Sequence, residues 1–284
     1  MATAAQISNA HVASLQKQND LFDRLRACDS LLIAFSGGAD SAYLAWAANQ
    51  ALGDRALAVT ALSASFSKHD RDQAEAFVHV SGVRHEFIET REFDNPLYVA
   101  NNADRCYHCK DELFDRMEAL AKERNFRAIA YGINADDTHD FRPGHRAAHE
   151  HKILAPLLDV GLGKAEIREL SRLAGLPTWD RPASACLSSR IPYGTAVTPA
   201  VLGKVERAEA VLRALGFSQF RVRAHGELAR IELAPEELSR GLQPEIAQQL
   251  ASQIKAAGFS FVTLDLEGYR QGSLNSLLRP KHQP

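Results

Sequence analysis

A run of apolar residues, 31–35, is followed directly by the loop Ser-Gly-Gly-Ala-Asp-Ser at positions 36–41 and by a second apolar stretch, 42–48. This order predicts a buried strand, a tight loop and a helix. The two glycines allow backbone amides to turn toward an oxyanion, and Ser36 and Ser41 add hydroxyl donors at the start of the helix. The loop therefore predicts a phosphate or pyrophosphate site.

This loop differs from two widespread nucleotide-binding motifs. It does not end in Gly-Lys-Ser or Gly-Lys-Thr, as a Walker A sequence does, and no dinucleotide-binding glycine pattern follows the strand. A turn rich in serine and glycine, without a ligand, is the alternative interpretation.

Apolar runs and helical patterns alternate along the first part of the chain. Strands are predicted at 31–35, 56–62, 85–88 and 127–131, and amphipathic helices at 12–26, 73–80, 110–124 and 164–174. This alternation predicts an α/β fold with a doubly wound parallel sheet. Ligands of such sheets bind at the carboxyl ends of the strands, which is where the loop 36–41 lies.

The character of the sequence changes after residue 177. Residues 178–199 are rich in Pro, Ser and Thr, which predicts a long loop or linker between a first domain, 1–177, and a second, 200–284. The second domain is expected to be a small α+β unit that binds substrate or mediates oligomerisation. Its predicted elements are helices at 201–215 and 244–257 and strands at 220–223, 229–233 and 259–266.

Composition excludes several classes of protein. The chain has 33 Lys and Arg against 35 Asp and Glu, so its overall charge gives no case for nucleic-acid binding. No apolar segment is long enough to span a bilayer, and residues 1–20 lack the basic and apolar regions of a signal peptide, so a cytoplasmic location is expected. Four cysteines in a chain of 284 residues do not indicate a disulfide scaffold.

Two of the cysteines, Cys106 and Cys109, stand three residues apart, directly after Asp104, a candidate cap for the following helix. Thiolates are favoured at a helix N-terminus because the positive end of the helix dipole lowers the thiol pKa. Cys186 lies in the predicted loop. Cys28 stands alone before the first strand and is expected to be structural.

Three thiolates can hold a four-iron, four-sulfur cluster and leave one iron without a protein ligand, so a cluster is favoured if Cys186 joins Cys106 and Cys109. A zinc site is an alternative, although His108 is awkwardly placed between the two thiols. A redox dithiol and two plainly packed cysteines are further alternatives. The histidines His145, His149 and His151 also suggest a metal site, but the surrounding residues predict an exposed loop.

Several motifs together resemble the LarE-type sulfur transferases of the PP-loop ATP pyrophosphatase superfamily, over about residues 20–278. The motifs are Ser36-Gly-Gly-Ala-Asp-Ser41, Arg105-Cys-Tyr-His-Cys-Lys110, Tyr131-Gly-Ile-Asn-Ala-Asp-Asp137, Phe141-Arg-Pro-Gly144, Pro182-Ala-Ser-Ala-Cys-Leu-Ser-Ser-Arg-Ile-Pro-Tyr-Gly194 and Asp265-Leu-Glu-Gly-Tyr-Arg270. The resemblance implies a PP-loop α/β fold and an enzyme that uses ATP to adenylate a carboxylate of a pyridinium dicarboxylate mononucleotide. The product is a thiocarboxylate on the route to a nickel-pincer nucleotide cofactor.

The resemblance also implies how sulfur is supplied. In part of the family, the cysteine at the position of Cys186 gives up its own sulfur and becomes dehydroalanine. Cys106 and Cys109 are instead typical of the three-cysteine form, which implies a 4Fe-4S cluster and an external sulfide or sulfur donor. Family members form homo-oligomers, so an oligomer such as a hexamer is expected.

Site residues follow from the same resemblance. ATP with Mg2+ is expected at Ser36, Gly37, Gly38, Asp40, Ser41, Gly132 and Asp136; the substrate phosphate at Ser189, Arg190, Arg221 and Arg223; the cluster at Cys106, Cys109 and Cys186, with Cys186 catalytic; and a divalent cation at Glu209 and Glu232. Arg221 and Arg223 alternate on a predicted strand and so share one face. Alternatives are a solvated basic strand face, solvent-facing glutamates, and a turn cap at Asp136 and Asp137.

Other functions are compatible with the same sequence features. A tRNA-thiolating enzyme shares the loop and often three cysteines, and should show a basic RNA-binding surface. An amide-forming synthetase of the same superfamily uses ammonia and needs no thiolates. An ATP-binding regulator without chemistry would release no pyrophosphate.

Overall fold

The computed structural model describes residues 4–139, 143–182, 185–270 and 272–274. The chain divides into two compact units: Met1–Ser63, Lys68–Arg91 and Cys106–Ser184 form the first, and Ala64–Ser67, Glu92–Arg105 and Ala185–Pro284 form the second. The break after Ser184 lies inside the predicted linker 178–199. Nothing in the sequence predicts that 64–67 and 92–105 belong to the second unit.

A parallel four-stranded sheet is the centre of the first unit. It consists of β1 (Leu31–Ala34), β2 (Ala56–Leu62), β3 (His85–Glu89) and β4 (Ala128–Tyr131), in the order β3-β2-β1-β4. Ile33 of β1 pairs with Ala58 on one side and with Ala130 on the other. The four predicted strands and their parallel arrangement are therefore confirmed.

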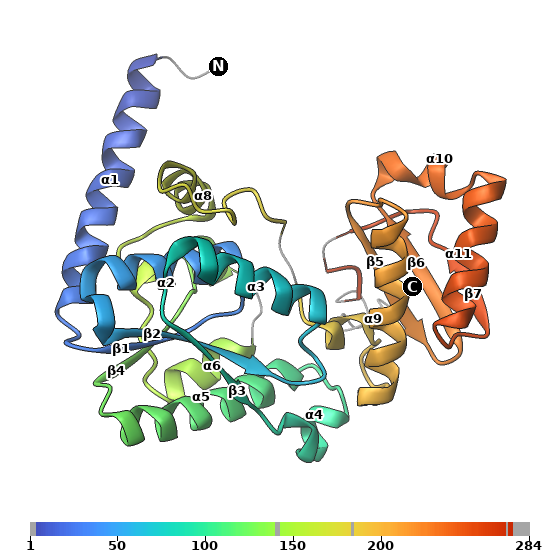
Figure 1. Ribbon diagram of the computed structural model, residues 1–284, viewed down its shortest axis with the longest axis horizontal. Helices are drawn as coiled ribbons and strands as arrows, with labels where there is room; N and C mark the ends of the chain where they lie inside the picture. The colour runs from blue at the N-terminus through green and yellow to red at the C-terminus, as the bar shows by residue number, and fades with distance from the viewer. Residues whose placement is uncertain (1–3, 140–142, 183–184, 271, 275–284) are drawn as a thin grey trace, which may run out of the picture. The chain divides into compact units, whose positions relative to one another are not determined.

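Helices cover both faces of this sheet, α2 and α3 above it and α5 and α6 below it in Figure 1. The helices of the first unit are α1 (Ala4–Arg26), α2 (Ala39–Leu52), α3 (Lys68–Ser81), α5 (Arg105–Arg124), α6 (Pro143–Glu150), α7 (Pro156–Asp159) and α8 (Lys164–Leu173), with the 3-10 turns η1 (Gly53–Arg55) and η3 (Ala135–His139). Phe114 and Met117 of α5 are fully buried and pack with Leu32, Leu57 and Ile129 of the sheet. This packing is the doubly wound α/β arrangement that the alternating pattern predicts.

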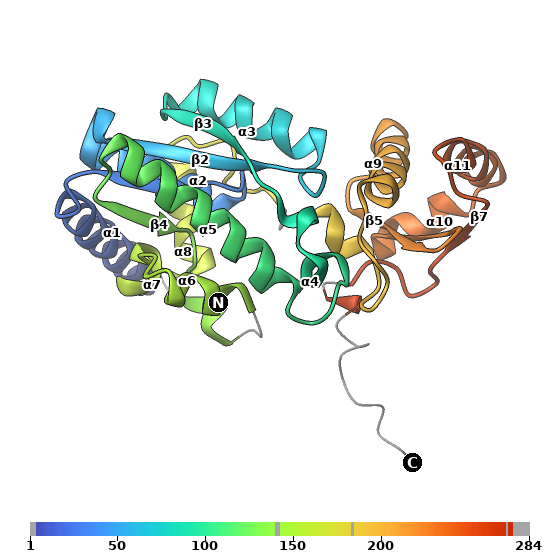
Figure 2. The same ribbon diagram turned by 90° about the horizontal axis from the view of Figure 1, so that it is seen from below.

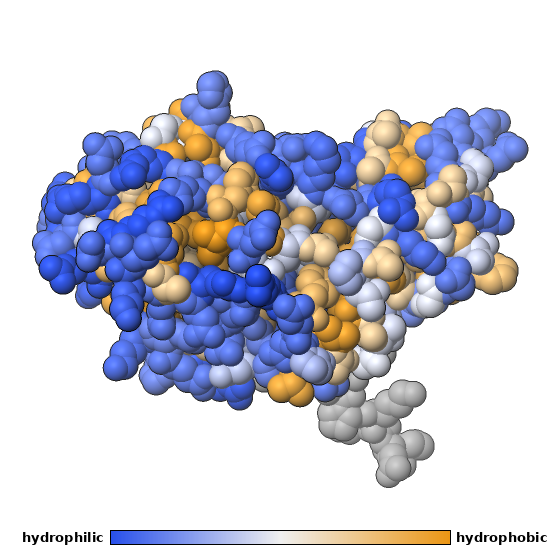
Figure 3. All heavy atoms as spheres, turned by 60° about the horizontal axis from the view of Figure 1, so that its bottom comes forward, coloured by the Kyte–Doolittle hydropathy of each residue, from blue (hydrophilic) through white to orange (hydrophobic). Residues whose placement is uncertain are grey.

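The hydropathy of the first unit's surface agrees with the prediction of amphipathic helices (Figure 3). Hydrophilic residues make up most of the first unit's face in Figure 3, the view in which α5 and α6 come forward, with hydrophobic patches between them. No helix within the described ranges combines the length and the apolar character that a membrane span requires.

The second unit is a small α+β unit, seen from a second side in Figure 2. Its sheet has the order β5-β6-β7, with β5 (Phe220–His225) antiparallel to β6 (Leu228–Leu233) and β7 (Phe261–Leu264) parallel to β6. Its helices are α4 (Pro96–Val99), α9 (Pro199–Ala214), α10 (Leu238–Gly241) and α11 (Pro244–Ala256), with the 3-10 turns η2 (Glu92–Asp94), η4 (Leu187–Arg190) and η5 (Pro235–Glu237). The predicted helices and strands of this part are present, and only the last strand is shorter than expected.

Candidate functional site

The loop of residues 36–41 joins β1 to α2, at the carboxyl end of the sheet. Gly37 has a φ of +76°, a conformation that favours glycine. Ser41 Oγ lies 3.0 Å from Ser36 Oγ, accepts a hydrogen bond from the Ser36 N–H at 3.2 Å and donates to the Gly38 carbonyl at 3.1 Å. These bonds fix the loop, while the first N–H groups of α2 need acceptors from outside the helix. The geometry suits a bound anion.

Gly132 lies against this loop from the neighbouring strand, directly after β4. A Cβ atom at position 132 would lie 2.8 Å from both the Cα and the N of Ser41. Because these are backbone atoms and not the end of a flexible side chain, a larger residue at position 132 would displace the end of β4 or the loop. The structure thus gives Gly132 a role in shaping the loop.

Carboxylates gather beside the loop. Asp40 accepts a hydrogen bond from Asn134 Nδ2 at 3.1 Å, and burial, followed by the nearby charge of Asp137, raises the pKa of Asp40. Lys164 Nζ lies 2.8 Å from Asp137 Oδ1. Asp136 instead accepts from the backbone N–H of Lys164 at 2.7 Å, so its carboxylate caps the start of α8.

The cysteine pair lies where the sequence predicts a helix to begin. Cys106 and Cys109 are both near the start of α5, with Cys106 exposed and Cys109 half-buried. Residues three apart lie on the same side of a helix, so both thiols are presented in one direction. Cys28 is half-buried, and burial, followed by the charge of Asp29, raises the pKa of its thiol, which favours the uncharged form.

Cys186 is exposed and directly precedes the turn η4. Its neighbours are anchored within the second unit: the Leu187 N–H donates to the Ser65 carbonyl at 2.9 Å, and the Ser188 hydroxyl lies 2.7 Å from the Tyr98 hydroxyl. Ser188 is fully buried. The thiol therefore stands on a firmly held turn, and the Ser188 side chain belongs to the support of that turn.

Asn101 holds the chain that follows Cys186, and sequence reasoning missed it. Its Nδ2 donates to the carbonyls of Pro192 and Thr195, both at 2.9 Å, and its Oδ1 accepts from Arg105 Nη1 at 2.6 Å. Arg105 also donates to the Ser188 carbonyl at 2.8 Å. No local pattern distinguishes Asn101 from the asparagine beside it, since its partners lie about ninety residues away.

Arg190 and Glu209 form a buried pair in the second unit. Arg190 Nε and Nη2 donate to the two carboxylate oxygens of Glu209 at 2.9 and 3.1 Å. Glu209 Oε1 also accepts from the Val222 N–H at 3.2 Å. Arg190 Nη1 reaches the Cys186 carbonyl at 3.0 Å and the Ser189 hydroxyl at 3.1 Å, so this pair also supports the turn that bears Cys186.

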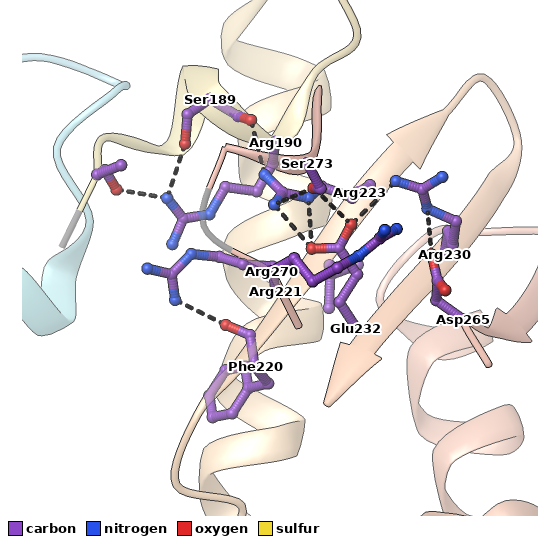
Figure 4. A network of polar contacts seen from close by, with 12 residues as sticks. Ser189, Arg190, Phe220, Arg221, Arg223, Arg230, Glu232, Asp265, Arg270 and Ser273 are labelled. Atoms are coloured by element: carbon purple, nitrogen blue, oxygen red, sulfur yellow. Dashed lines mark hydrogen bonds and ion pairs between the residues drawn. The ribbon is translucent and has the colours of Figure 1, made fainter. Parts of the chain in front are cut away.

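A second buried network centres on Glu232 (Figure 4). Arg223 Nη2 donates to Glu232 Oε2 at 2.7 Å, while Arg230 and Ser273 donate to Oε1 at 2.9 and 3.0 Å. Arg223 Nη1 donates to the Ser189 carbonyl at 2.9 Å. Glu209 and Glu232 therefore both bind arginines in this structure, and neither faces solvent; their cation-binding role stays a prediction.

Arg221 differs from the other two predicted phosphate-binding arginines. It is half-buried, with its guanidinium 5.2 Å from the centre of the Tyr269 ring. Burial lowers the pKa of Arg221, and the charge of Arg190 adds to this effect. A partly desolvated cation beside a second cation favours a bound anion. A freely solvated basic strand face, the alternative interpretation, does not describe Arg221 or the buried Arg223.

Comparison with known proteins identifies the family. No known family model matches the chain. The pyridinium-3,5-bisthiocarboxylic acid mononucleotide synthase of Lactiplantibacillus plantarum is 33% identical over 264 residues, which cover 92% of this chain and 95% of the synthase. The chain belongs to the family of this synthase.

Two further proteins are similar in sequence to this chain. An uncharacterized protein from Synechocystis is 45% identical over 250 residues, 88% of this chain and 93% of the relative. One chain of the glutamine-hydrolyzing GMP synthase of Archaeoglobus fulgidus is 27% identical over 198 residues, 64% of this chain and 62% of the relative. Together with the sheet and its loop, the matches to the pyridinium nucleotide synthase and to the GMP synthase place this chain among the ATP-utilising enzymes of the PP-loop superfamily.

The histidines His145, His149 and His151 lie on α6 or directly after it. The prediction that they lie in an exposed loop is wrong. Residues 143–150 form α6, because Ala147 and Ala148 bury the apolar side of the helix. His151 follows directly, with Nδ1 2.9 Å from Glu118 Oε1 and Nε2 3.1 Å from Asp111 Oδ1. His151, Glu118 and Asp115 also place one ligand atom each within 4.8 Å of one another. Two members of this group, His151 and Glu118, already pair with each other.

This contact predicts a pH-dependent contribution to stability. Burial lowers the pKa of His151, but the hydrogen bonds that the ring donates to Asp111 and Glu118 outweigh it and raise the pKa overall. A raised folded pKa means that the stabilisation is complete below about pH 6.5 and is lost as the pH rises through the folded value. His151→Ala is expected to lower the unfolding free energy by about 1 kcal/mol at low pH and by less at high pH.

Chemical denaturation at about pH 6 and about pH 9 measures the effect. His149→Ala is the matched control, since His149 is an exposed histidine of the neighbouring helix. An equal loss at both pH values would show that the ring packs against Phe114 without contributing through its charge.

Proposed function

We propose that the chain is an ATP-dependent sulfur transferase that converts a carboxylate of a pyridinium dicarboxylate mononucleotide to a thiocarboxylate. The observation that carries the proposal is the loop between β1 and α2, whose glycine backbone and helix N-terminus suit the phosphates of ATP, in a member of a family that includes a bisthiocarboxylic acid nucleotide synthase. The exposed thiol of Cys186 supplies the chemical group that an amide synthetase would not need.

The first step is adenylation. A substrate carboxylate oxygen attacks the α-phosphorus of ATP, the bond from that phosphorus to the bridging oxygen breaks, and pyrophosphate leaves with the electron pair. Backbone N–H groups of the loop, with Ser36 and Ser41, would stabilise the charge that grows on the phosphates. Asp40 and Asp137 would hold Mg2+, whose charge would offset the burial and the Asp137 charge that together raise the Asp40 pKa.

The second step replaces AMP by sulfur. A sulfur nucleophile attacks the acyl carbon, the carbon–oxygen bond to AMP breaks, and AMP leaves. On the sacrificial route, the Cys186 thiolate is that nucleophile; loss of the Cys186 Cα proton then breaks the Cβ–S bond, leaving dehydroalanine in the chain and the sulfur on the product.

The cysteine set favours the other route. Cys106 and Cys109 present two thiols from one helix turn, and Cys186 is exposed, so three sulfur donors of the kind that bind iron are accessible. We therefore propose that these three residues hold a 4Fe-4S cluster. When bound, such a cluster would supply sulfide, from an external donor, to the activated acyl group and would allow repeated turnover.

The substrate phosphate is proposed to bind near Ser189 and Arg221. Arg221 is the strongest candidate among the arginines, because its burial and the neighbouring charge of Arg190 favour a bound anion beside it. Homo-oligomer formation and a role for Glu209 and Glu232 in cation binding stay predictions.

The experiment is mass spectrometry of the small-molecule products after anaerobic incubation with Mg-ATP, sulfide and the pyridinium dicarboxylate mononucleotide. Iron-reconstituted wild-type protein is expected to give AMP and a product with oxygen replaced by sulfur. Folded, ATP-binding protein that gives no thiolated product would refute the proposal, and a product carrying an amide after incubation with ammonia would favour the synthetase alternative.

Two cysteine variants separate the sulfur routes. Cys186→Ser is expected to abolish the thiolated product, while ATP binding is unchanged. Cys106→Ser is expected to lose iron and multiple turnover. If Cys106→Ser keeps the same iron content and activity, and the Cys186 peptide of the wild type loses the mass of hydrogen sulfide, the sacrificial route is correct. Cys28→Ser is the control and should behave as the wild type.

A further inference from the structure

An arginine outside the recognised motifs, Arg181, contacts the backbone of the loop 36–41. Arg181, after α8, is largely buried, with a side-chain exposure of 13%. Its Nη1 donates to the Gly37 carbonyl at 2.7 Å, and its Nη2 lies 2.9 Å from Asp70 Oδ1 on α3. One guanidinium therefore joins the loop to α3.

The backbone around Arg181 is held as well. Arg168 of α8 donates to the Arg181 carbonyl from Nη2 at 2.7 Å and to the Trp179 carbonyl from Nη1 at 3.3 Å. The Arg181 side chain is thus held at both ends, by the bonds to its backbone and by the ion pair of its guanidinium with Asp70. Burial lowers the pKa of Arg181, and the Asp70 charge acts in the opposite direction.

Arg181 contacts the peptide group of the loop whose orientation is least restricted by side chains. This peptide lies between Gly37 and Gly38, and a peptide flanked by two glycines can rotate at little steric cost. In a trans peptide the carbonyl and the N–H point in opposite directions. A Gly37 carbonyl directed at Arg181 therefore turns the Gly38 N–H to the other side, where Ser36 Oγ accepts it at a long 3.4 Å. A flipped peptide would instead present a carbonyl oxygen to the phosphates.

We propose that Arg181 is a positioning residue that holds the Gly37–Gly38 peptide in the orientation that binds the pyrophosphate part of ATP, with Asp70 fixing its guanidinium. This inference rests on the proposed function only in taking the loop as the ATP site. Arg181 acts through the loop backbone and is not assigned a contact with the nucleotide.

The test is calorimetric titration of wild type, Arg181→Gln, Arg181→Lys and Asp70→Asn with Mg-pyrophosphate, Mg-ATP and adenosine. Arg181→Gln is expected to weaken pyrophosphate and ATP binding at least about tenfold and to leave adenosine binding unchanged, because only the phosphate-binding amides are affected. The pyrophosphate affinity of Arg181→Lys should lie between those of the wild type and Arg181→Gln, since one ammonium group cannot reach both partners as a guanidinium does. Arg172→Gln, which breaks an exposed ion pair on α8, is the control.

Two results would overturn the inference: a folded Arg181→Gln protein that binds pyrophosphate like the wild type, or an equal loss of pyrophosphate and adenosine binding. If Arg181→Gln does not fold, Asp70→Asn decides, with a smaller but equally selective loss expected and no loss refuting the role. A further outcome is that pyrophosphate binding depends on Arg181 while the wild-type protein makes no thiolated product. That combination of results would refute the proposed function and leave this inference standing.

Discussion

Replacement of Gly132 by alanine is expected to lower the rate of ATP-dependent pyrophosphate release about 100-fold. The added Cβ would lie 2.8 Å from the Cα and N of Ser41, so either the end of β4 or the start of α2 has to move. A displacement of about 1 Å in a group that positions a reacting phosphate costs about that factor. Overpacking is also expected to lower the unfolding free energy by about 1–3 kcal/mol.

Release of pyrophosphate from ATP in the presence of the pyridinium substrate measures this effect, together with thermal unfolding. Gly203→Ala is the control, because position 203 lies within α9 and a Cβ there meets only the end of the flexible Arg207 side chain. Normal pyrophosphate release from Gly132→Ala would mean that the strand and the loop separate easily, and that the loop geometry of this structure is not the catalytic one.

The second large effect is expected from Glu232→Gln, which keeps the shape of the side chain and removes its charge. Glu232 is fully buried, and Arg223 and Arg230 both donate to it. Removal of the charge leaves the buried Arg223 guanidinium without its carboxylate, while Arg230 keeps its ion pair with Asp265. Loss of one partner costs about 3–5 kcal/mol in comparable buried pairs. Because a native domain is stable by only about 5–15 kcal/mol, the second unit should unfold at markedly lower denaturant concentration.

Chemical denaturation with and without Mn2+ tests this prediction and separates the two roles considered for Glu232. Glu227→Gln is the control, since Glu227 is exposed and its pair with Lys204 is expected to contribute little. A small loss in Glu232→Gln, together with Mn2+ stabilisation of the wild type that the variant lacks, would show that the carboxylate serves a cation and that the arginine network is secondary.

Local patterns were sufficient for most of the fold. Apolar runs such as 31–35 and 56–62 correspond to β1 and β2, because a strand buried on both faces needs a continuous apolar sequence. The loop 36–41 and the cysteine pair at the start of α5 were predictable for the same reason, since the residues that define them are neighbours in sequence. Alternation of strands and helices then leaves few topologies other than a parallel sheet.

Helix starts were less well predicted than strands. Three helices start earlier than their apolar periodicity indicates, at Ala4, Lys68 and Arg105. In α3 and α5 the apolar periodicity begins only at the turns that pack against the core, and the first turn of a helix needs capping rather than burial.

The sequence alone thus determined the strand-loop-helix unit, the parallel sheet, the positions of the thiols and the family. Only the tertiary structure decided which distant residues support them: Gly132 against Ser41, Arg181 on Gly37, Asn101 against the segment after Cys186, Glu209 with Arg190, and Glu232 with Arg223. The physical reason is that periodicity and turn chemistry act over a few residues. Partners separated by nine to 144 residues are chosen by packing, which no local pattern records.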